Sequence, residues 1–251
     1  MKPMNQDISK LLGEAIDIRK SESFQLFKKV LEIRMAFGIY ASNYNLLYRN
    51  IDSYYNRYDE IFWDFNKRNK YQKTIIRDFH NTLTSARSFV ERYEEFNLES
   101  QEHCFFKELR NFTMHISHLP LISHKTYKEK NIINFESFKK TEFNKYLEKE
   151  IKKHPKWNCL KLARVYSKKV ENTSLNELFK IYDVSMRQVY NRTVLNFIRQ
   201  NHKELFQILS TIKNINLNLN KNGITSNHTL NPIYIRYVEI LLKKSLYPSY
   251  F

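Results

Sequence analysis

The chain has 251 residues, of which 42% are hydrophobic and 15% aromatic, enough to bury one sizeable core or two modest ones. Only three glycines and five prolines interrupt it, which is too few for the turns of an all-β or doubly wound α/β protein and favours long helices. The formal charge of +16 indicates a phosphate-bearing partner, although an AT-rich coding sequence that favours Lys, Asn and Ile explains it equally well.

Cysteine usage and the N-terminus bear on the compartment. Cys104 and Cys159 are far apart in sequence and have no His or Cys at metal-ligand spacing, so no structural zinc site is expected. Asp7, Glu14 and Asp17 interrupt the first apolar segment, which argues against a signal peptide. No apolar stretch approaches the roughly 20 residues of a membrane helix. The sequence therefore predicts a cytoplasmic protein without a membrane segment.

Apolar residues recur at helical spacing through the first 120 residues. The spacing predicts a short amphipathic helix over 8–16, one long or kinked helix over 24–65, a polar break at 67–70, a third helix over 76–93 and a fourth over 105–116 that ends before Pro120. The fold class is therefore mainly α, with an up-and-down helical bundle of long helices as its core.

The second half of the chain is less regular. In chain order it predicts a small β-hairpin near 121–138, a helix over 142–153, further helices over 160–212 with a break near 172–174, an asparagine-rich connection over 214–231 and a last helix over 233–242. We expect one helical domain over 1–212, followed by a polar connection and a C-terminal helix over 213–251.

The fourth predicted helix carries a dense group of functional side chains. At about 100° per residue, Arg110, Asn111, His115 and Glu108 fall on one polar side of this helix, opposite an apolar side. A histidine beside a guanidinium can move a proton while the cation stabilises charge that develops on a phosphate. RNA needs both, because its 2′-hydroxyl must lose a proton to attack the neighbouring phosphorus. This chemistry requires no metal or cofactor.

The segment from Glu108 to His115 resembles the R-(polar)-x-x-x-H signature of the HEPN superfamily of ribonucleases, with Asn111 as the polar residue after Arg110. The resemblance covers about 24–120, where the long helices before the motif are similar to the family's up-and-down bundle. It implies a metal-independent endoribonuclease that leaves a 2′,3′-cyclic phosphate, acting as a toxin or antiviral defence effector.

The resemblance also implies a role for each motif residue. His115 transfers the proton, Arg110 clamps the phosphate, Asn111 orients His115 or the phosphate, and Glu108 positions His115. Two protomers of a homodimer bring their motif helices together in a composite site, and an antitoxin or other partner protein restrains it. Some HEPN domains instead keep the fold as inactive interaction modules, and that alternative stays open.

Two further patterns have competing interpretations. Residues 174–199 resemble a DNA-binding helix-turn-helix in which Ser185 and Gln188 cap a recognition helix bearing Arg187 and Arg192, but one continuous helix also fits the apolar spacing. His80 lies on the polar side of the third helix, facing the motif helix, where a buried hydrogen-bonded histidine is the favoured interpretation.

Overall fold

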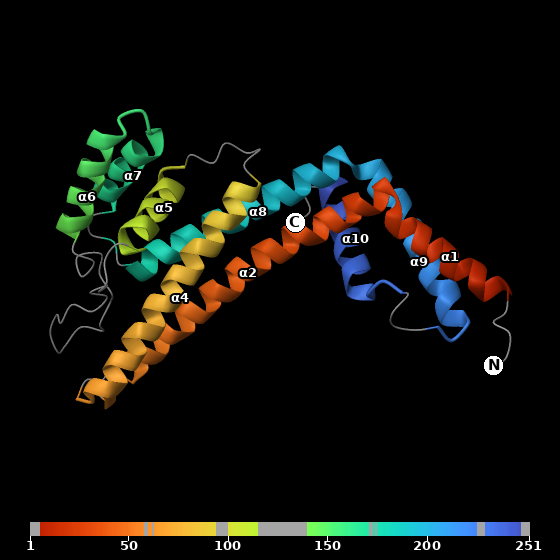
Figure 1. The fold of residues 1–251 in the computed structure, drawn as a ribbon, viewed down its shortest axis with the longest axis horizontal. Helices are drawn as coiled ribbons and strands as arrows, with labels where there is room; N and C mark the ends of the chain where they lie inside the picture. The colour runs from red at the N-terminus through yellow and green to blue at the C-terminus, as the bar shows by residue number, and fades with distance from the viewer. Residues whose placement is uncertain are drawn as a thin grey trace. The chain divides into compact units, whose positions relative to one another are not determined.

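The computed structural model describes residues 6–57, 60–61, 63–93, 100–114, 140–170, 173, 175–224 and 229–246. All regular elements of this described part are α-helices (Figure 1), which confirms the predicted mainly α class. The β-hairpin expected near 121–138 lies outside the described residues. None of the described helices combines the length and the apolar character needed to cross a bilayer.

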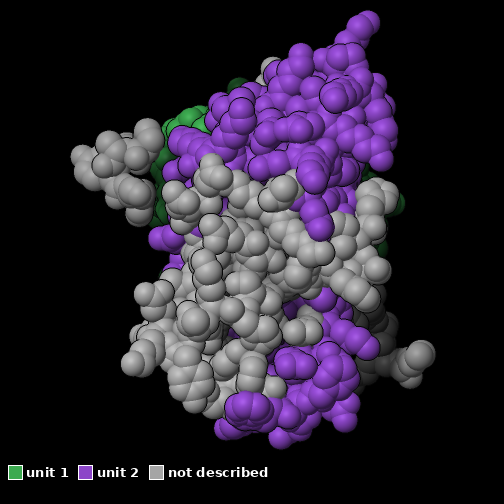
Figure 2. All heavy atoms as spheres, turned by 90° about the vertical axis from the view of Figure 1, so that its left-hand side faces the viewer, with its two compact units in different colours: residues 1–35, 189–251 green, residues 36–188 purple. Residues whose placement is uncertain are grey.

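The chain forms two compact units, coloured separately in Figure 2. Unit 1 comprises residues 1–35 and 189–251, and unit 2 comprises residues 36–188. The helices α2 (Glu22–Asn56) and α8 (Leu175–Gln200) belong partly to each unit. Unit 1 adds α1 (Gln6–Lys20), α9 (His202–Lys221) and α10 (Pro232–Leu246), and unit 2 adds α4 (Phe65–Arg92), α5 (Gln101–Met114), α6 (Lys140–Lys153) and α7 (Asn158–Lys169).

In unit 2, α2 and α4 form a long antiparallel hairpin (Figure 1). The ring centroids of Phe37 and Phe89 are 5.7 Å apart, and the Asn50 amide donates to the Asp78 carboxylate at 2.5 Å. As residue numbers rise along α2 they fall along α4, which defines the antiparallel direction. The long helices predicted over 24–65 and 76–93 therefore pair with each other.

The connection between these two helices differs from the prediction. Residues 67–70 are not a break but belong to the first turns of α4. Their polar composition resembled a loop because these turns border solvent. The helix starts after Asp64, whose carboxylate accepts a hydrogen bond from the Lys67 backbone N–H at 3.0 Å. This hydrogen bond also lowers the pKa of the Asp64 carboxyl.

Helix α5 lies at the centre of unit 2 and packs through two consecutive aromatic residues. Phe106 stacks on Tyr182 of α8, with ring centroids 4.1 Å apart. Phe105 points to another side, with its centroid 5.6 Å from Phe143 of α6 and 5.3 Å from Tyr166 of α7. Both phenylalanines are fully buried, so α5 is packed on more than one side.

A disulfide joins Cys104 of α5 to Cys159 of α7. Nothing in the sequence indicates this pairing, because 55 residues separate the two cysteines. Their Cα atoms are 5.1 Å apart, a usual separation for a disulfide. Since such bonds persist in oxidising compartments, the pairing does not favour the predicted cytoplasmic location, which stays a prediction.

Residues 175–200 form one uninterrupted helix, α8, so the helix-turn-helix is not formed there. Ser185 does not start a recognition helix, because it lies within α8. Its hydroxyl donates to the Glu102 carboxylate of α5 at 2.6 Å. Arg187 forms an ion pair with Asp183 one turn earlier, at 2.7 Å. The buried side of this single helix carries Leu178, Tyr182 and Met186, each four residues apart, whereas Ile181 is 43% exposed.

In unit 1, α9 extends to Lys221, so the expected asparagine-rich connection begins later than predicted and the expected boundary at 212/213 falls inside a helix. Ile215 and Leu219 are buried against Ala15 of α1, which explains why this asparagine-rich segment is helical. Gly223, with φ of 72°, ends the helix and lets the Ile224 N–H donate to the Leu219 carbonyl at 3.0 Å.

We expect reduction of the Cys104–Cys159 disulfide to destabilise unit 2. A cross-link across 55 residues restricts the unfolded chain enough to contribute about 4 kcal/mol in the chain-entropy model. Thermal unfolding with and without a thiol reductant should show a melting temperature lower by roughly 10 °C after reduction. As a control, the unfolded, unreduced protein should not react with a thiol-alkylating reagent, and uptake of two alkyl groups would show that the disulfide is absent.

Candidate functional site

The predicted amphipathic character of the motif helix is present in α5. Leu109 and Phe112 are buried at 0% and 6% exposure, whereas Arg110 and Asn111 are half-buried and reach the surface. The predicted apolar and polar sides are therefore in place for these four residues. Three of the four predicted site residues, Glu108, Arg110 and Asn111, are described and lie together, while His115 lies outside the described residues.

The Arg110 side chain reaches across to α4. Its Nε donates to the hydroxyl of Thr84 at 3.1 Å, and one terminal nitrogen donates to Oδ1 of Asn111 at 3.4 Å. Within the described part of the chain no carboxylate forms an ion pair with Arg110. Its remaining guanidinium N–H groups are therefore available to an anion.

Asn111 connects Arg110 to a buried carboxylate. Its amide nitrogen donates to Oε2 of Glu108 at 3.4 Å, while its amide oxygen accepts from Arg110. The hydroxyl of Tyr146, on α6, donates to the same Glu108 oxygen at 3.1 Å. Hydrogen bonds thus run from α4 through α5 to α6, and they fix which way the Asn111 amide points.

Glu108 is only 4% exposed, so its environment differs from that of a surface glutamate. Burial raises the pKa of the Glu108 carboxyl, and the hydrogen bonds from Asn111 and Tyr146 offset only part of this effect. Burial beside Glu108 also raises the pKa of the Tyr146 hydroxyl, which therefore stays protonated and acts as a donor. Glu108, which was predicted on the polar side of the helix, is buried instead.

His80 of α4 lies beside this cluster. The Thr113 hydroxyl has one hydrogen, which it donates to the Arg110 backbone carbonyl at 2.9 Å. With the Thr113 hydrogen used in that bond, His80 Nδ1, 3.5 Å from the same hydroxyl, is assigned as the donor, and the neutral imidazole then has an unprotonated Nε2. Burial and the nearby Arg110 charge lower the pKa of His80, so the imidazole is neutral at neutral pH.

His80 was expected to face the motif helix as a buried hydrogen-bonded histidine. It does face α5 and is hydrogen-bonded, but it is half-buried and adjoins the Arg110 cluster. The position of His80 on the polar side of α4 was the sequence feature from which it could have been predicted as a site residue. The sequence does not show the residue with which it pairs, because Thr113 lies 33 positions away.

No protein-family model, curated protein or solved structure matches this chain. The chemistry of the cluster therefore follows from its own groups. It combines a cation with free donors, a neutral imidazole and a fixed amide, which suits a phosphate and a hydroxyl that must lose a proton. Among the described residues, no three His, Cys, Asp or Glu side chains gather as metal ligands.

We expect Glu108→Gln to stabilise the protein at mildly alkaline pH. Because the folded state raises the pKa of Glu108, ionising this carboxyl costs stability as pH rises through the folded pKa, whereas glutamine stays neutral and accepts the same hydrogen bonds. The variant should melt higher than the natural protein at about pH 8, and the difference should vanish near pH 4, where the carboxyl is protonated.

The matched control is Glu14→Gln on the exposed side of α1, which makes the same charge change in unit 1. Its melting temperature relative to the natural protein should vary little over this range. A Glu108→Gln protein that is less stable at about pH 8 would show that the cluster needs the ionised carboxylate.

Proposed function

We propose that this protein is a HEPN-like, metal-independent endoribonuclease, which cuts RNA to leave a 2′,3′-cyclic phosphate and a 5′-hydroxyl. The observation that carries the proposal is the half-buried Arg110, with guanidinium donors free for a phosphate, beside the neutral imidazole of His80. The resemblance of the segment from Arg110 to His115 to the HEPN signature supports the same assignment.

The reaction needs two proton transfers. A neutral imidazole takes the proton of the 2′-hydroxyl as the bond from O2′ to phosphorus forms, and an imidazolium gives a proton to O5′ as the bond from phosphorus to O5′ breaks. His80 fits the first role because it is neutral, and His115 is assigned the second. Arg110 neutralises the charge that develops on the phosphorane oxygens. Asn111, held by Glu108, orients the guanidinium.

The finer parts of the proposal follow from the HEPN resemblance. Two protomers bring their α5 helices together in a composite site. A partner protein restrains the activity, as expected of a toxin or defence effector. The DNA-binding alternative receives no support, because residues 175–200 form one helix without the turn that it requires.

Purified protein should cut single-stranded RNA in the presence of a metal chelator, and Arg110→Ala and His115→Ala should each lower the rate by at least about 100-fold. The products should accept phosphate from polynucleotide kinase directly, because they carry 5′-hydroxyl ends. The matched control is Arg49→Ala, which removes the same charge from an exposed side of α2 and should retain activity. Full cleavage by the Arg110 and His115 variants would remove the proposed site, and an inert natural protein would favour the inactive interaction module.

The rate of cleavage should be bell-shaped in pH: it rises along an acidic limb as the base loses its proton and falls at higher pH as the acid loses its own. Because burial and Arg110 lower the pKa of His80, the midpoint of the acidic limb should lie below about 6.5, the ordinary value for histidine. The His80→Gln variant keeps a side chain that can hydrogen-bond to Thr113 but cannot take a proton in this range, so it should lose the acidic limb as well as most of the rate. A profile unchanged in His80→Gln would assign the base elsewhere.

A further inference from the structure

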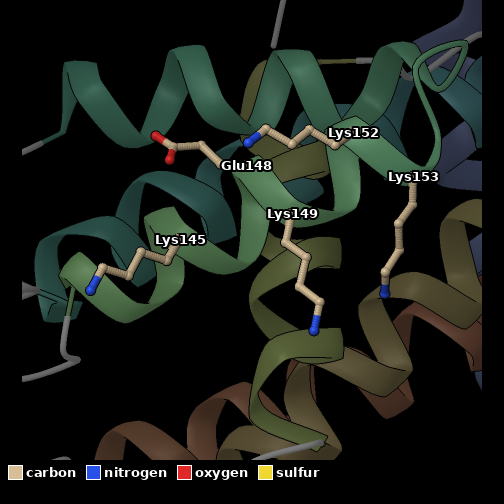
Figure 3. Close-up of a pocket in the computed structure, with 5 residues that line it drawn as sticks. All are labelled: Lys145, Glu148, Lys149, Lys152 and Lys153. Atoms are coloured by element: carbon tan, nitrogen blue, oxygen red, sulfur yellow. The ribbon is translucent and has the colours of Figure 1, made fainter.

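The outward side of α6 is a surface of exposed lysines. Lys145, Lys149, Lys152 and Lys153, with Glu148, line an open hollow of about 390 Å³. All five side chains are exposed, and Lys149 and Lys153 point the same way from successive turns (Figure 3). We call these four lysines the lysine face. It presents several ammonium groups within two to three turns of one helix.

The charge of the lysine face is largely uncompensated. Among the described residues, no carboxylate forms an ion pair with Lys145, Lys149 or Lys152. The Glu148 carboxylate, the one acidic group lining the hollow, is paired with Arg164 of α7 at 2.5 Å. Between residues 140 and 170 there are ten Lys and Arg against three Glu, so this short segment holds a large part of the total charge of +16.

An exposed aromatic ring lies just beyond the end of α6. Trp157 is 58% exposed, and its ring stacks on that of His154, with centroids 4.1 Å apart and planes within 11° of parallel. His154 is the residue after Lys153, so the ring pair directly follows the lysine face in the chain. Proteins that bind single strands combine these two features, because lysines attract the phosphates while bases stack on aromatic rings.

The other side of α6 argues against insertion into a membrane. Phe143 and Leu147 are fully buried and turned into unit 2, so α6 has no free apolar side to insert between lipids. The ammonium groups therefore suit a polyanion that stays in water, such as a nucleic-acid strand.

Helix α6 also reaches the candidate site. Tyr146, which donates to Glu108, lies between Lys145 and Lys149 in the sequence. Successive residues of a helix rise about 1.5 Å, so Lys149 and Lys153 lie about 5 Å and about 10 Å beyond Tyr146 along α6. A strand that ran along this row from Trp157 would pass Lys153 and Lys149 before it reached Tyr146, the residue of α6 that contacts Glu108.

We propose that the lysine face and Trp157 form a binding track for single-stranded RNA, in which the lysines contact phosphates and the tryptophan stacks on a base. The track deepens the proposed ribonuclease function, on which it rests, by naming an unpaired strand as the substrate class. Its binding can be measured apart from cleavage with a thymidylate oligonucleotide, which has phosphates and bases but no 2′-hydroxyl.

Tryptophan fluorescence tests the stacking contact, because the chain has two tryptophans. Trp63→Phe leaves Trp157 as the reporter, and Trp157→Phe leaves Trp63, which is 82% exposed and more accessible than Trp157. Titration with a thymidylate oligonucleotide about 20 nucleotides long should quench the first protein and not the second. Quenching confined to Trp63, or none in either protein, would overturn the tryptophan contact.

Fluorescence anisotropy of the same labelled oligonucleotide tests the lysines. The triple variant Lys145→Gln, Lys149→Gln and Lys152→Gln should bind roughly tenfold more weakly, and the slope of log affinity against log salt should fall by about 2, since each phosphate contact on a single strand contributes about 0.7.

The matched control replaces three exposed lysines of unit 1, Lys28, Lys203 and Lys221, by glutamine and so removes the same charge. It should bind within about twofold of the natural protein. Equal weakening in both triple variants would show that only net charge matters, and no weakening in either would place the strand elsewhere. Binding to vesicles of anionic lipid but not to the oligonucleotide would also overturn the proposal.

The two proposals fail in different ways. A protein that binds the oligonucleotide through the track but cuts no RNA in chelator retains the track and loses the ribonuclease. A protein that cuts RNA equally well with and without the lysine substitutions, and binds the oligonucleotide unchanged, retains the ribonuclease and loses the track.

Discussion

The packing of α5 is the constraint on which the rest of unit 2 depends. Phe105 and Phe106 are neighbours in the sequence and lie about 100° apart around the helix, so they pack against different partner helices. Aromatic pairs of this kind contribute about 0.5–1.5 kcal/mol each beyond the area they bury. The disulfide at Cys104 holds the helix at the preceding residue. With α5 unable to rotate, Arg110 and Asn111 keep their outward direction.

A buried carboxylate beneath this polar edge costs stability, since charge is poorly solvated inside a protein. Glu108 nevertheless occupies that position and takes hydrogen bonds from Tyr146 and Asn111. An apolar residue there would leave the Tyr146 hydroxyl and the Asn111 amide without their acceptor. In return, Glu108 fixes the orientation of the Asn111 amide, whose nitrogen donates to Glu108 and whose oxygen accepts from Arg110. A guanidinium held in this way is a fixed donor, and fixed donors can stabilise a transition state without reorganising.

Helices with one apolar side could be predicted from the sequence, whereas features that depend on a partner far away in the chain could not. The stripes over 105–116 and 142–153 predicted α5 and α6, because burial on one side leaves a period of 3.6 residues. The start of α4 was misplaced, because Lys67 and Lys70 on a solvent-facing turn have the composition of a loop. The disulfide between Cys104 and Cys159 depends on tertiary contact, so no local pattern announces it.

The candidate site shows the same division. Periodicity alone placed Arg110 and Asn111 on a polar edge, and both are there. Periodicity also placed Glu108 on that edge, but Glu108 is buried. It accepts a hydrogen bond from Tyr146 of α6, a donor that the periodicity of α5 cannot reveal. His80 adjoins the cluster for a similar reason, because the pairing of α4 with α5 brings it to Thr113.

The two kinds of cation in unit 2 fit two tasks. A guanidinium is a planar fork whose donors match two phosphate oxygens at once, which suits Arg110 to a phosphate whose geometry changes during reaction. An ammonium on a flexible stem is a point charge that accepts phosphates in many positions, which suits the lysine face to a strand of any sequence. Arg110 is held by Thr84 and Asn111, whereas Lys145 and Lys149 have no described ion-pair partner. Under the proposed function, the held cation would serve the reaction, and the unpaired ones would serve the binding of a strand.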